Sequence, residues 1–337
     1  MPIEEFGQTD AGETVHRITL SGGGLTARIM TWGATIQELW LDGHDAPLTL
    51  GFPDFASYPL HAPYFGATPG RYANRIAGGR FSIDAVEYQL DRNENGITHL
   101  HGGSHGISRR IWTLGAHGPD FAEFTILDPD GQAGYPGNCR ITTRYSLGDG
   151  GKLSVTYRSE ADRATIVNIA QHSYFNLDGT DSILDHELMI AADHYLPTDS
   201  LQIPTGEIAL VEGTDFDFRD MRPIRQLDAG GQQVGYDHNF CLASERGPVR
   251  SVVLARSLNS GVAMEVRSSE PGVQFYTGFK ITPSVPGLSG KPYGACAGFC
   301  LETQVWPDSP NHPAFPQAVL RPGETLVQHT DYIFMKS

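Results

Sequence analysis

The chain lacks the sequence features of several large protein classes. Its 24 basic residues are outnumbered by 39 acidic ones, which gives a net charge of −15. Binding of nucleic acid needs a basic surface, so we expect no nucleic-acid partner. No apolar run approaches the ~18 residues that a membrane helix requires, so we expect no membrane partner. The acidic N-terminus has no apolar signal segment, and we therefore expect a cytoplasmic protein.

Cysteine and cofactor motifs are also scarce. The four cysteines, Cys139, Cys241, Cys296 and Cys300, form no C-x-x-C pair. Cys296 and Cys300 could supply half of a metal site, but reduced thiols packed in a core are the interpretation we favour. The sequence has neither G-x-G-x-x-G nor a P-loop, so we expect no nucleotide cofactor. A G-x-S-x-G elbow is absent too, which argues against a serine hydrolase.

What the chain does contain is apolar alternation with a period of two, interrupted by turns. The 39 glycines and 22 prolines are spread along all 337 residues without a period. This pattern favours an all-β fold, a sandwich or barrel, in a single domain over residues 1–337. Expected strands lie at residues 17–20, 25–41 as either one strand or two strands broken at Gly33, 81–90 as a hairpin turning at Asp84–Ala85, 121–127, 140–147, 152–159, 187–191, 249–256, 261–266, 273–277 and 325–334. Asp217–Leu227 is the best helix candidate, and Ile281–Ala297 is an expected surface loop.

Two segments in the first third of the chain carry polar residues suited to a ligand. The segment GRYANRIAGGRF, from Gly70, contains Asn74 and Arg75, which can donate hydrogen bonds to hydroxyls or to a developing negative oxygen. The segment HLHGG contains His99 and His101, which on a strand would point to one face, as metal sites require. The glycines that follow favour instead a histidine that binds a small polar ligand.

Later segments add a titratable histidine and two carboxylates. His172 in QHSYFNLDG can exchange a proton near neutral pH, and Tyr174 offers a flat face for a sugar. Asp237 in YDHNF can accept hydroxyl hydrogen bonds or cap a turn. Gln274 in PGVQFYTG lies on a short expected strand. Glu302 in FCLETQ would become a competent base if it is buried, because burial raises the pKa of a carboxyl group.

Together and in this order, these segments resemble the aldose 1-epimerase (galactose mutarotase) family, from about Gly66 to Phe334. The closing strings PDSPNHPAFP and RPGETLVQHTDYIF extend the resemblance. It implies a large antiparallel β-sandwich, the galactose mutarotase-like supersandwich. It also implies a cofactor-free and metal-free isomerase that interconverts the α and β anomers of a hexose such as galactose or glucose. In that family Glu302 would be the general base and His172 the general acid, with Asn74, Arg75, His101, Tyr174, Asp237 and Gln274 binding the sugar.

Two departures from the family pattern leave the preferred sugar open. Gln171 stands where Asn is frequent, and Phe279–Lys280 replaces the usual TGN-type continuation. The rival interpretations are a glycoside hydrolase, a non-catalytic sugar-binding module and a metal enzyme built on His99 and His101. The expected partner is a small aldose, and the expected assembly is a monomer or homodimer.

Overall fold

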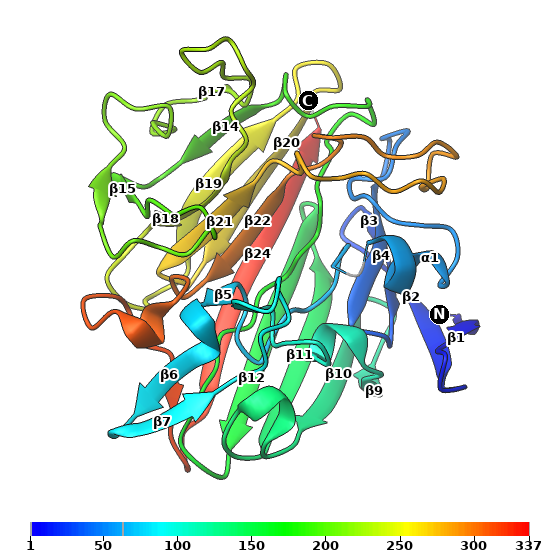
Figure 1. Ribbon diagram of the computed structural model, residues 1–337. Helices are drawn as coiled ribbons and strands as arrows, with labels where there is room; N and C mark the ends of the chain where they lie inside the picture. Colours follow the sequence, from blue (N-terminus) through cyan, green and yellow to red (C-terminus); the bar gives the residue numbers. More distant parts are fainter. Residues whose placement is uncertain (1, 63, 337) are drawn as a thin grey trace.

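Antiparallel β-strands are the main regular elements of this computed structural model, which describes residues 2–62 and 64–336 (Figure 1). The longest sheet has nine strands in the spatial order β17–β14–β19–β20–β24–β12–β11–β10–β9. Their bounds are β9 Thr113–His117, β10 Phe121–Asp128, β11 Cys139–Gly148, β12 Lys152–Ala161, β14 Glu187–Ile190, β17 Arg222–Pro223, β19 Arg250–Arg256, β20 Val262–Ser268 and β24 Leu326–Lys336.

A five-stranded sheet and a four-stranded sheet accompany the long one. The five-stranded sheet has the order β16–β15–β18–β21–β22 and contains β15 His194–Tyr195, β16 Ala209–Leu210, β18 Asp237–Cys241, β21 Gly272–Tyr276 and β22 Cys300–Gln304. The four-stranded sheet runs β1–β2–β3–β4 and contains β1 Ile3–Gln8, β2 Thr14–Gly22, β3 Leu25–Met30 and β4 Thr35–Leu41. Three two-stranded ribbons pair β5 Arg75–Ile76 with β8 His99–Leu100, β6 Arg80–Ile83 with β7 Val86–Gln89, and β13 Thr165–Ile166 with β23 Val319–Leu320.

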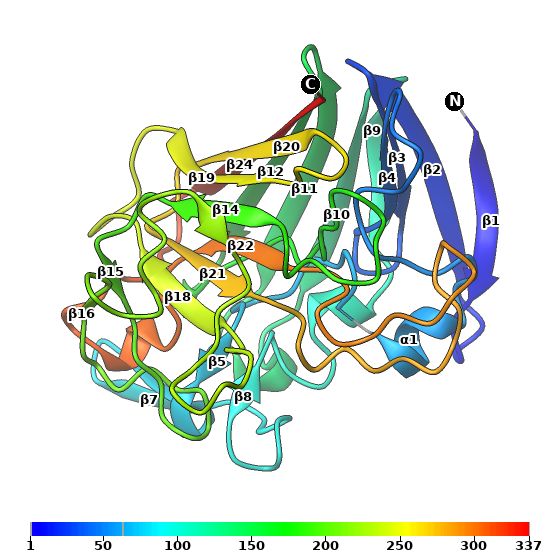
Figure 2. The ribbon, with the colours of Figure 1, turned by 90° about the horizontal axis from the view of Figure 1, so that it is seen from above.

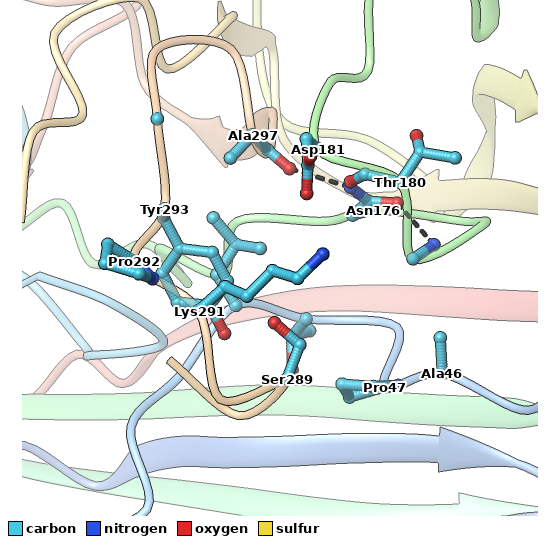
Figure 3. Close-up of a pocket in the computed structure, with 14 residues that line it drawn as sticks. Ala46, Pro47, Asn176, Thr180, Asp181, Ser289, Lys291, Pro292, Tyr293 and Ala297 are labelled. Atoms are coloured by element: carbon cyan, nitrogen blue, oxygen red, sulfur yellow. Dashed lines mark hydrogen bonds between the residues drawn. The ribbon is translucent and has the colours of Figure 1, made fainter. Parts of the chain in front are cut away.

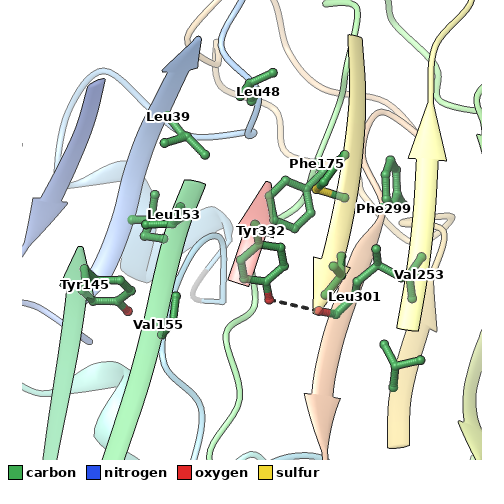
Figure 4. Close-up of a cluster of buried hydrophobic side chains, with 14 of the residues drawn as sticks. Leu39, Leu48, Tyr145, Leu153, Val155, Phe175, Val253, Phe299, Leu301 and Tyr332 are labelled. Atoms are coloured by element: carbon green, nitrogen blue, oxygen red, sulfur yellow. Dashed lines mark hydrogen bonds between the residues drawn. The ribbon is translucent and has the colours of Figure 1, made fainter. Parts of the chain in front are cut away.

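The main core lies where the nine-stranded sheet faces the two shorter sheets, so the expected sandwich is confirmed (Figure 2). Alternate residues of β11 and β12 are buried, which is the period-two pattern of a sheet with one face in the core. Val155 of β12 and Tyr332 of β24 belong to one apolar cluster with Leu39 of β4 and Leu301 of β22 (Figure 4). Each large apolar side chain buried in this way contributes ~1.5–3 kcal/mol to stability.

The predicted turns are confirmed. Residues 25–41 form β3 and β4, and they separate at Gly33, whose φ of 66° suits glycine. The hairpin of β6 and β7 turns at Asp84 and Ala85, both with positive φ, as a type I′ turn requires. Ile281–Ala297 contains no helix or strand, in agreement with the expected loop.

The helix predicted at Asp217–Leu227 is wrong. The Asp217 carboxylate binds the Arg219 guanidinium at 2.7 Å, and Arg222 donates to the carbonyl oxygens of Asp215 and Asp217, which a helix would use internally. Pro223 has no N–H to donate.

The helices that do form are short: α1 Ser57–His61 and the 3₁₀ turns η1 Ala77–Gly79, η2 Ile107–Arg109, η3 Gln132–Gly134 and η4 Ser309–Asn311. Within the described ranges, no helix has the length and apolar character needed to cross a membrane.

Candidate active site

Three adjacent strands of the five-stranded sheet present polar side chains on one face. Gln274 on β21 pairs with Glu302 on β22, and Asp237 lies on β18 on the other side of β21. Alternation along β22 directs Glu302 away from Leu301, which packs in the core. Although β22 is the edge strand of its sheet, Glu302 is only 2% exposed. The strand predicted around Glu302 is therefore confirmed, and the carboxyl group is buried.

The segment that contains His172 is held by its backbone against Gly66–Ala67. The His172 N–H donates to Ala67 O at 3.0 Å, and the Gly66 N–H donates to His172 O at 3.0 Å. The buried imidazole then places Nε2 3.7 Å from Oε1 of Glu302, while Nδ1 lies 3.5 Å from Sγ of Cys300. The two residues expected to act as acid and base are thus brought together from segments 130 residues apart.

His101 lies beside His172, with ring centroids 5.2 Å apart. His101 follows the short strand β8 and has a φ of 52°. His99 and His101 therefore do not lie on one strand, and their rings do not share a face as expected. The Asn74 N–H donates to His101 Nδ1 at 3.1 Å, which leaves the proton of the neutral ring on Nε2. His99 points elsewhere: its Nδ1 contacts Asp91 O and its Nε2 contacts the Tyr135 hydroxyl. The idea of a metal enzyme built on the His99–His101 pair is therefore wrong.

Another group of three residues could offer metal ligands: His101, His172 and Glu302 are buried, with ligand atoms within 4.8 Å of one another. Two imidazoles and one carboxylate are a donor set that zinc accepts. The Asn74 N–H opposes this use, because a metal on Nε2 of His101 would require the ring proton to move to Nδ1, where the N–H already points. The geometry therefore suits hydrogen-bond donation by His101 better than metal binding.

Arg75 is fixed by a two-pronged ion pair. Its Nε and Nη2 each donate to Glu94 at 2.8 Å, and its backbone N–H donates to the side-chain oxygen of Asn74 at 2.9 Å. Arg71 in the same segment faces the interior and binds Asp128 at 2.8 Å, so it stabilises the fold. Unlike Arg71, Arg75 lies toward Asp237 and Glu302, since both carboxylates raise the pKa of Arg75.

Asp237 and Gln274 form the far wall of the site. Gln274 Nε2 donates to Asp237 Oδ1 at 2.8 Å, and Gln202 Nε2 donates to Asp237 Oδ2 at 2.8 Å. Oε1 of Gln274 and Oε2 of Glu302 are buried without a hydrogen-bond partner among the described residues. A buried oxygen without a hydrogen-bond partner destabilises the fold unless a ligand or a water molecule donates to it. The site is therefore suited to bind hydroxyl groups.

Aromatic rings border the two histidines. Tyr174 stacks on His172 with centroids 5.1 Å apart, as its expected place in the site requires. Tyr64 lies 4.7 Å from His101 and 5.7 Å from His172, centroid to centroid. Neither Tyr64 nor Gln202 lies in a segment with a chemical pattern of its own, so the sequence predicts no role for either residue.

Burial shifts the pKa values of the two central groups in opposite directions. Desolvation, assisted by the charge of Asp237, raises the pKa of Glu302 to about 8, while Arg75 opposes the rise. Desolvation lowers the pKa of His172 to about 4. Between these two pKa values the pair therefore holds one proton, which lies on Glu302 because the pKa of Glu302 is the higher of the two.

A pocket of about 70 Å³ lies away from these residues, beneath the loop 281–297 (Figure 3). Asn176 lines it, but its amide nitrogen already donates to Thr180 O at 2.7 Å and Ala297 O at 2.8 Å. Lys291 and Asp181 lie at its rim and are exposed. None of the expected catalytic or sugar-binding residues lines this pocket, which leaves the face around Glu302 as the candidate site.

Comparison with known proteins agrees with this geometry. The family model described as aldose 1-epimerase matches residues 16–332. The galactose mutarotase of Bos taurus is 44% identical, with 97% of this chain and 96% of the relative covered. The aldose 1-epimerase of Escherichia coli K12 is 36% identical, with 96% of each chain covered.

Solved structures show the same arrangement. An aldose epimerase homologue from C. elegans superposes with a TM-score of 0.88 at 27% identity, covering 95% of this chain and 98% of that one. A galactose 1-epimerase from Lactobacillus acidophilus gives 0.84 at 28% identity, covering 100% and 98%. The chain therefore belongs to the aldose 1-epimerase family and is an isomerase that acts on sugars.

Proposed function

We propose that this enzyme interconverts the α and β anomers of a hexose such as galactose or glucose, with Glu302 as general base and His172 as general acid. The observation that carries the proposal is the buried pair itself, with Nε2 and Oε1 separated by 3.7 Å. Asn74, Arg75, His101, Tyr174, Asp237 and Gln274 are the proposed sugar-binding residues.

The reaction needs only proton transfers and the opening of one bond. Transfer of the resting proton from Glu302 to His172 across the 3.7 Å gap prepares a carboxylate and an imidazolium, and Arg75 favours this state because it stabilises the carboxylate. Glu302 takes the proton of the anomeric hydroxyl while His172 protonates the ring oxygen, and the bond between C1 and that oxygen breaks. The open aldehyde rotates about C1–C2, and the ring closes on the other face with both proton transfers reversed.

The residues around Glu302 and His172 support these roles. The tautomer of His101 places an Nε2–H donor beside His172, where it can stabilise negative charge on the ring oxygen. The aromatic rings of Tyr64 and Tyr174 provide flat faces against which a sugar ring packs. The unpartnered oxygens of Gln274 and Glu302 can accept sugar hydroxyls.

A glycoside hydrolase is less well supported, because it needs a second carboxyl group as acid or nucleophile. Asp237 is the carboxylate nearest in the network, and its two oxygens each accept an N–H, from Gln274 and from Gln202. Both oxygens of Asp237 are therefore already in use as hydrogen-bond acceptors. A non-catalytic sugar-binding module would have no need for a titratable pair such as Glu302 and His172.

The reaction as written uses no cofactor and no metal, because the two side chains exchange the protons themselves. The partner is a small aldose. The cytoplasmic location and the monomeric or homodimeric state remain predictions from the sequence, and the net charge of −15 favours a soluble particle that resists aggregation.

Polarimetry on freshly dissolved α-anomers tests the function and identifies the sugar. Galactose, glucose, arabinose and xylose are followed with and without enzyme, in a buffer whose own catalysis is subtracted. We expect at least one hexose to reach anomeric equilibrium much faster with enzyme. No acceleration with any of the four aldoses would overturn the proposal.

A further inference from the structure

Gln202 lies in the connection between β15 and β16, in a rigid turn. Oδ1 of Asp199 accepts the backbone N–H groups of Leu201 at 2.8 Å and Ile203 at 3.0 Å. Gln202 between them has a φ of 61°, which is uncommon for a residue with a side chain. The turn thus fixes the backbone of Gln202 and directs its side chain.

That side chain makes three hydrogen bonds to three separate segments. Its Oε1 accepts from Arg75 Nη2 at 3.0 Å and from Lys280 Nζ at 2.8 Å, and its Nε2 donates to Asp237 Oδ2 at 2.8 Å. Arg75 belongs to β5 and Asp237 to β18, while Lys280 lies just before the loop 281–297. Hydrogen bonds with a charged partner are the strong ones, and all three here involve a charged group.

The orientation of the amide matches the charges on either side of it. Its oxygen faces the cation Arg75 and its nitrogen faces the anion Asp237, so the amide separates two opposite charges that attract each other. Without the amide, Arg75 and Asp237 would be free to pair directly. A direct pair would consume the donors and acceptors that the sugar hydroxyls require.

We propose that Gln202 is a positioning residue of the sugar site, which holds Arg75 and Asp237 apart and links them through Lys280 to the loop 281–297. The inference rests on the proposed function. Among the described residues, the hydrogen-bond partners of the Gln202 side chain are Arg75, Asp237 and Lys280 rather than Glu302 or His172, so its loss should affect sugar binding rather than proton transfer. Phe279–Lys280 is also the segment that departs from the usual family pattern, which connects the Gln202–Lys280 bond to the choice of sugar.

The test uses Gln202→Met, which keeps the length and shape of the side chain and the backbone strain but removes the hydrogen bonds. We expect KM for the preferred hexose to rise about 10-fold or more, with kcat within about threefold of wild type, because several charge-assisted bonds are lost. Gln202→Glu keeps the acceptor for Arg75 and Lys280 and loses the donor to Asp237, so it should restore part of the affinity. Melting temperatures of all variants are measured to confirm folding.

Lys280→Met removes the hydrogen bond from Lys280 to Gln202 and the charge over the Phe279 ring, and it leaves the bonds of Gln202 to Arg75 and Asp237. Since Lys280 acts through Gln202, we expect a smaller rise in KM, and the double variant should match Gln202→Met rather than multiply the two effects. Lys291→Met is the matched control: this exposed lysine lines the pocket of Figure 3 instead and should leave KM unchanged.

An unchanged KM in Gln202→Met, equal losses in kcat and affinity, or fully additive effects of the two substitutions would each overturn the role of Gln202. The wild-type enzyme is assayed first on the same sugars. Absence of mutarotation in the wild type would contradict the proposed function, whereas a normal wild-type rate with an unaltered KM in Gln202→Met contradicts only the present inference.

Discussion

The burial of Glu302 suits its proposed role as a base and disfavours stability. Desolvation raises the pKa of this carboxyl group from 4.5 to about 8. Between these values the unfolded chain loses the proton and the folded chain keeps it, so the contribution of Glu302 to stability falls as pH rises through this window. A residue selected for folding alone would not be a carboxyl group at this position.

Because glutamine does not titrate, Glu302→Gln should be more stable than wild type near pH 8. The difference in stability between the variant and the wild type should be smaller near pH 4.5. Melting temperatures across this range measure the effect. Glu265→Gln, on β20 outside the site, is the control and should show no such gain toward high pH. A stability difference that shrinks from pH 4.5 to pH 8 would contradict the burial argument.

If Glu302 and His172 are the base and the acid, as proposed, these two groups also set the pH dependence of the reaction. Below about pH 4 both members of the pair carry a proton and no base remains, and above about pH 8 both have lost it and no acid remains. We expect a plot of kcat/KM against pH to be bell-shaped. The two apparent pKa values of this profile belong to the pair rather than to either residue alone. A profile that is flat across the alkaline limb would contradict the role of Glu302.

Individual residues also show how far sequence reasoning reaches. Asn74, Arg75 and Asp237 carry polar patterns that the sequence displays, and the structure places them around Glu302 and His172. Gln202 and Tyr64 display no pattern, because their contacts join segments distant in the chain. Their importance depends on the tertiary arrangement and cannot be read from neighbouring residues.

At the scale of elements, the sequence predicts the strands correctly, whereas the helix predicted at Asp217–Leu227 does not form. Strands such as β11 and β12 alternate for ten residues each, so their local pattern and their burial agree. Asp217–Leu227 has helical spacing of apolar residues. The Asp217 carboxylate instead accepts the backbone N–H of Arg219, and the Arg222 guanidinium donates to the carbonyl oxygen of Asp217. Side-chain hydrogen bonds to nearby backbone compete with helix formation, and propensity alone does not weigh them.

The two-residue strand β5 is too short to position Arg75 by its own pairing, so the loop around Asp308 supplies the remaining support. The Asp308 N–H donates to Arg75 O at 3.0 Å, and its Oδ1 accepts from the Ala77 N–H at 2.9 Å. We expect Asp308→Ala to lower the free energy of unfolding by ~1–3 kcal/mol and to raise KM.

Chemical denaturation and sugar-saturation kinetics measure these two quantities for Asp308→Ala. Asp185→Ala removes an exposed carboxylate paired with Arg225, far from β5 in the chain, and serves as the control. A stable Asp308→Ala variant with a normal KM would show that β5 is positioned without this loop.

At the scale of the whole molecule, one apolar cluster joins the nine-stranded sheet to both shorter sheets. We propose that the chain is a single domain and expect one cooperative unfolding transition, with circular dichroism and tryptophan fluorescence coinciding. Trp112 and Trp306 belong to different apolar clusters, so they report on different regions. Two separable transitions would contradict a single domain.

The order of strands within the sheets was beyond the sequence. Pairings such as β12 with β24 join residues more than 160 positions apart, and local alternation contains no information about the partner of a strand. The family resemblance supplied the architecture, which the structure confirms.

The central claim, that Glu302 and His172 are the base and the acid, is tested most directly by polarimetric kcat of Glu302→Gln and His172→Asn on the preferred sugar. We predict that each variant folds normally and loses about 10²–10⁴-fold in kcat, the usual contribution of one acid or base. Glu265→Gln and the exposed His117→Asn are matched controls expected to retain wild-type rates. If either Glu302→Gln or His172→Asn is folded and turns over the same sugar with near-normal kcat, that residue is not the proposed base or acid.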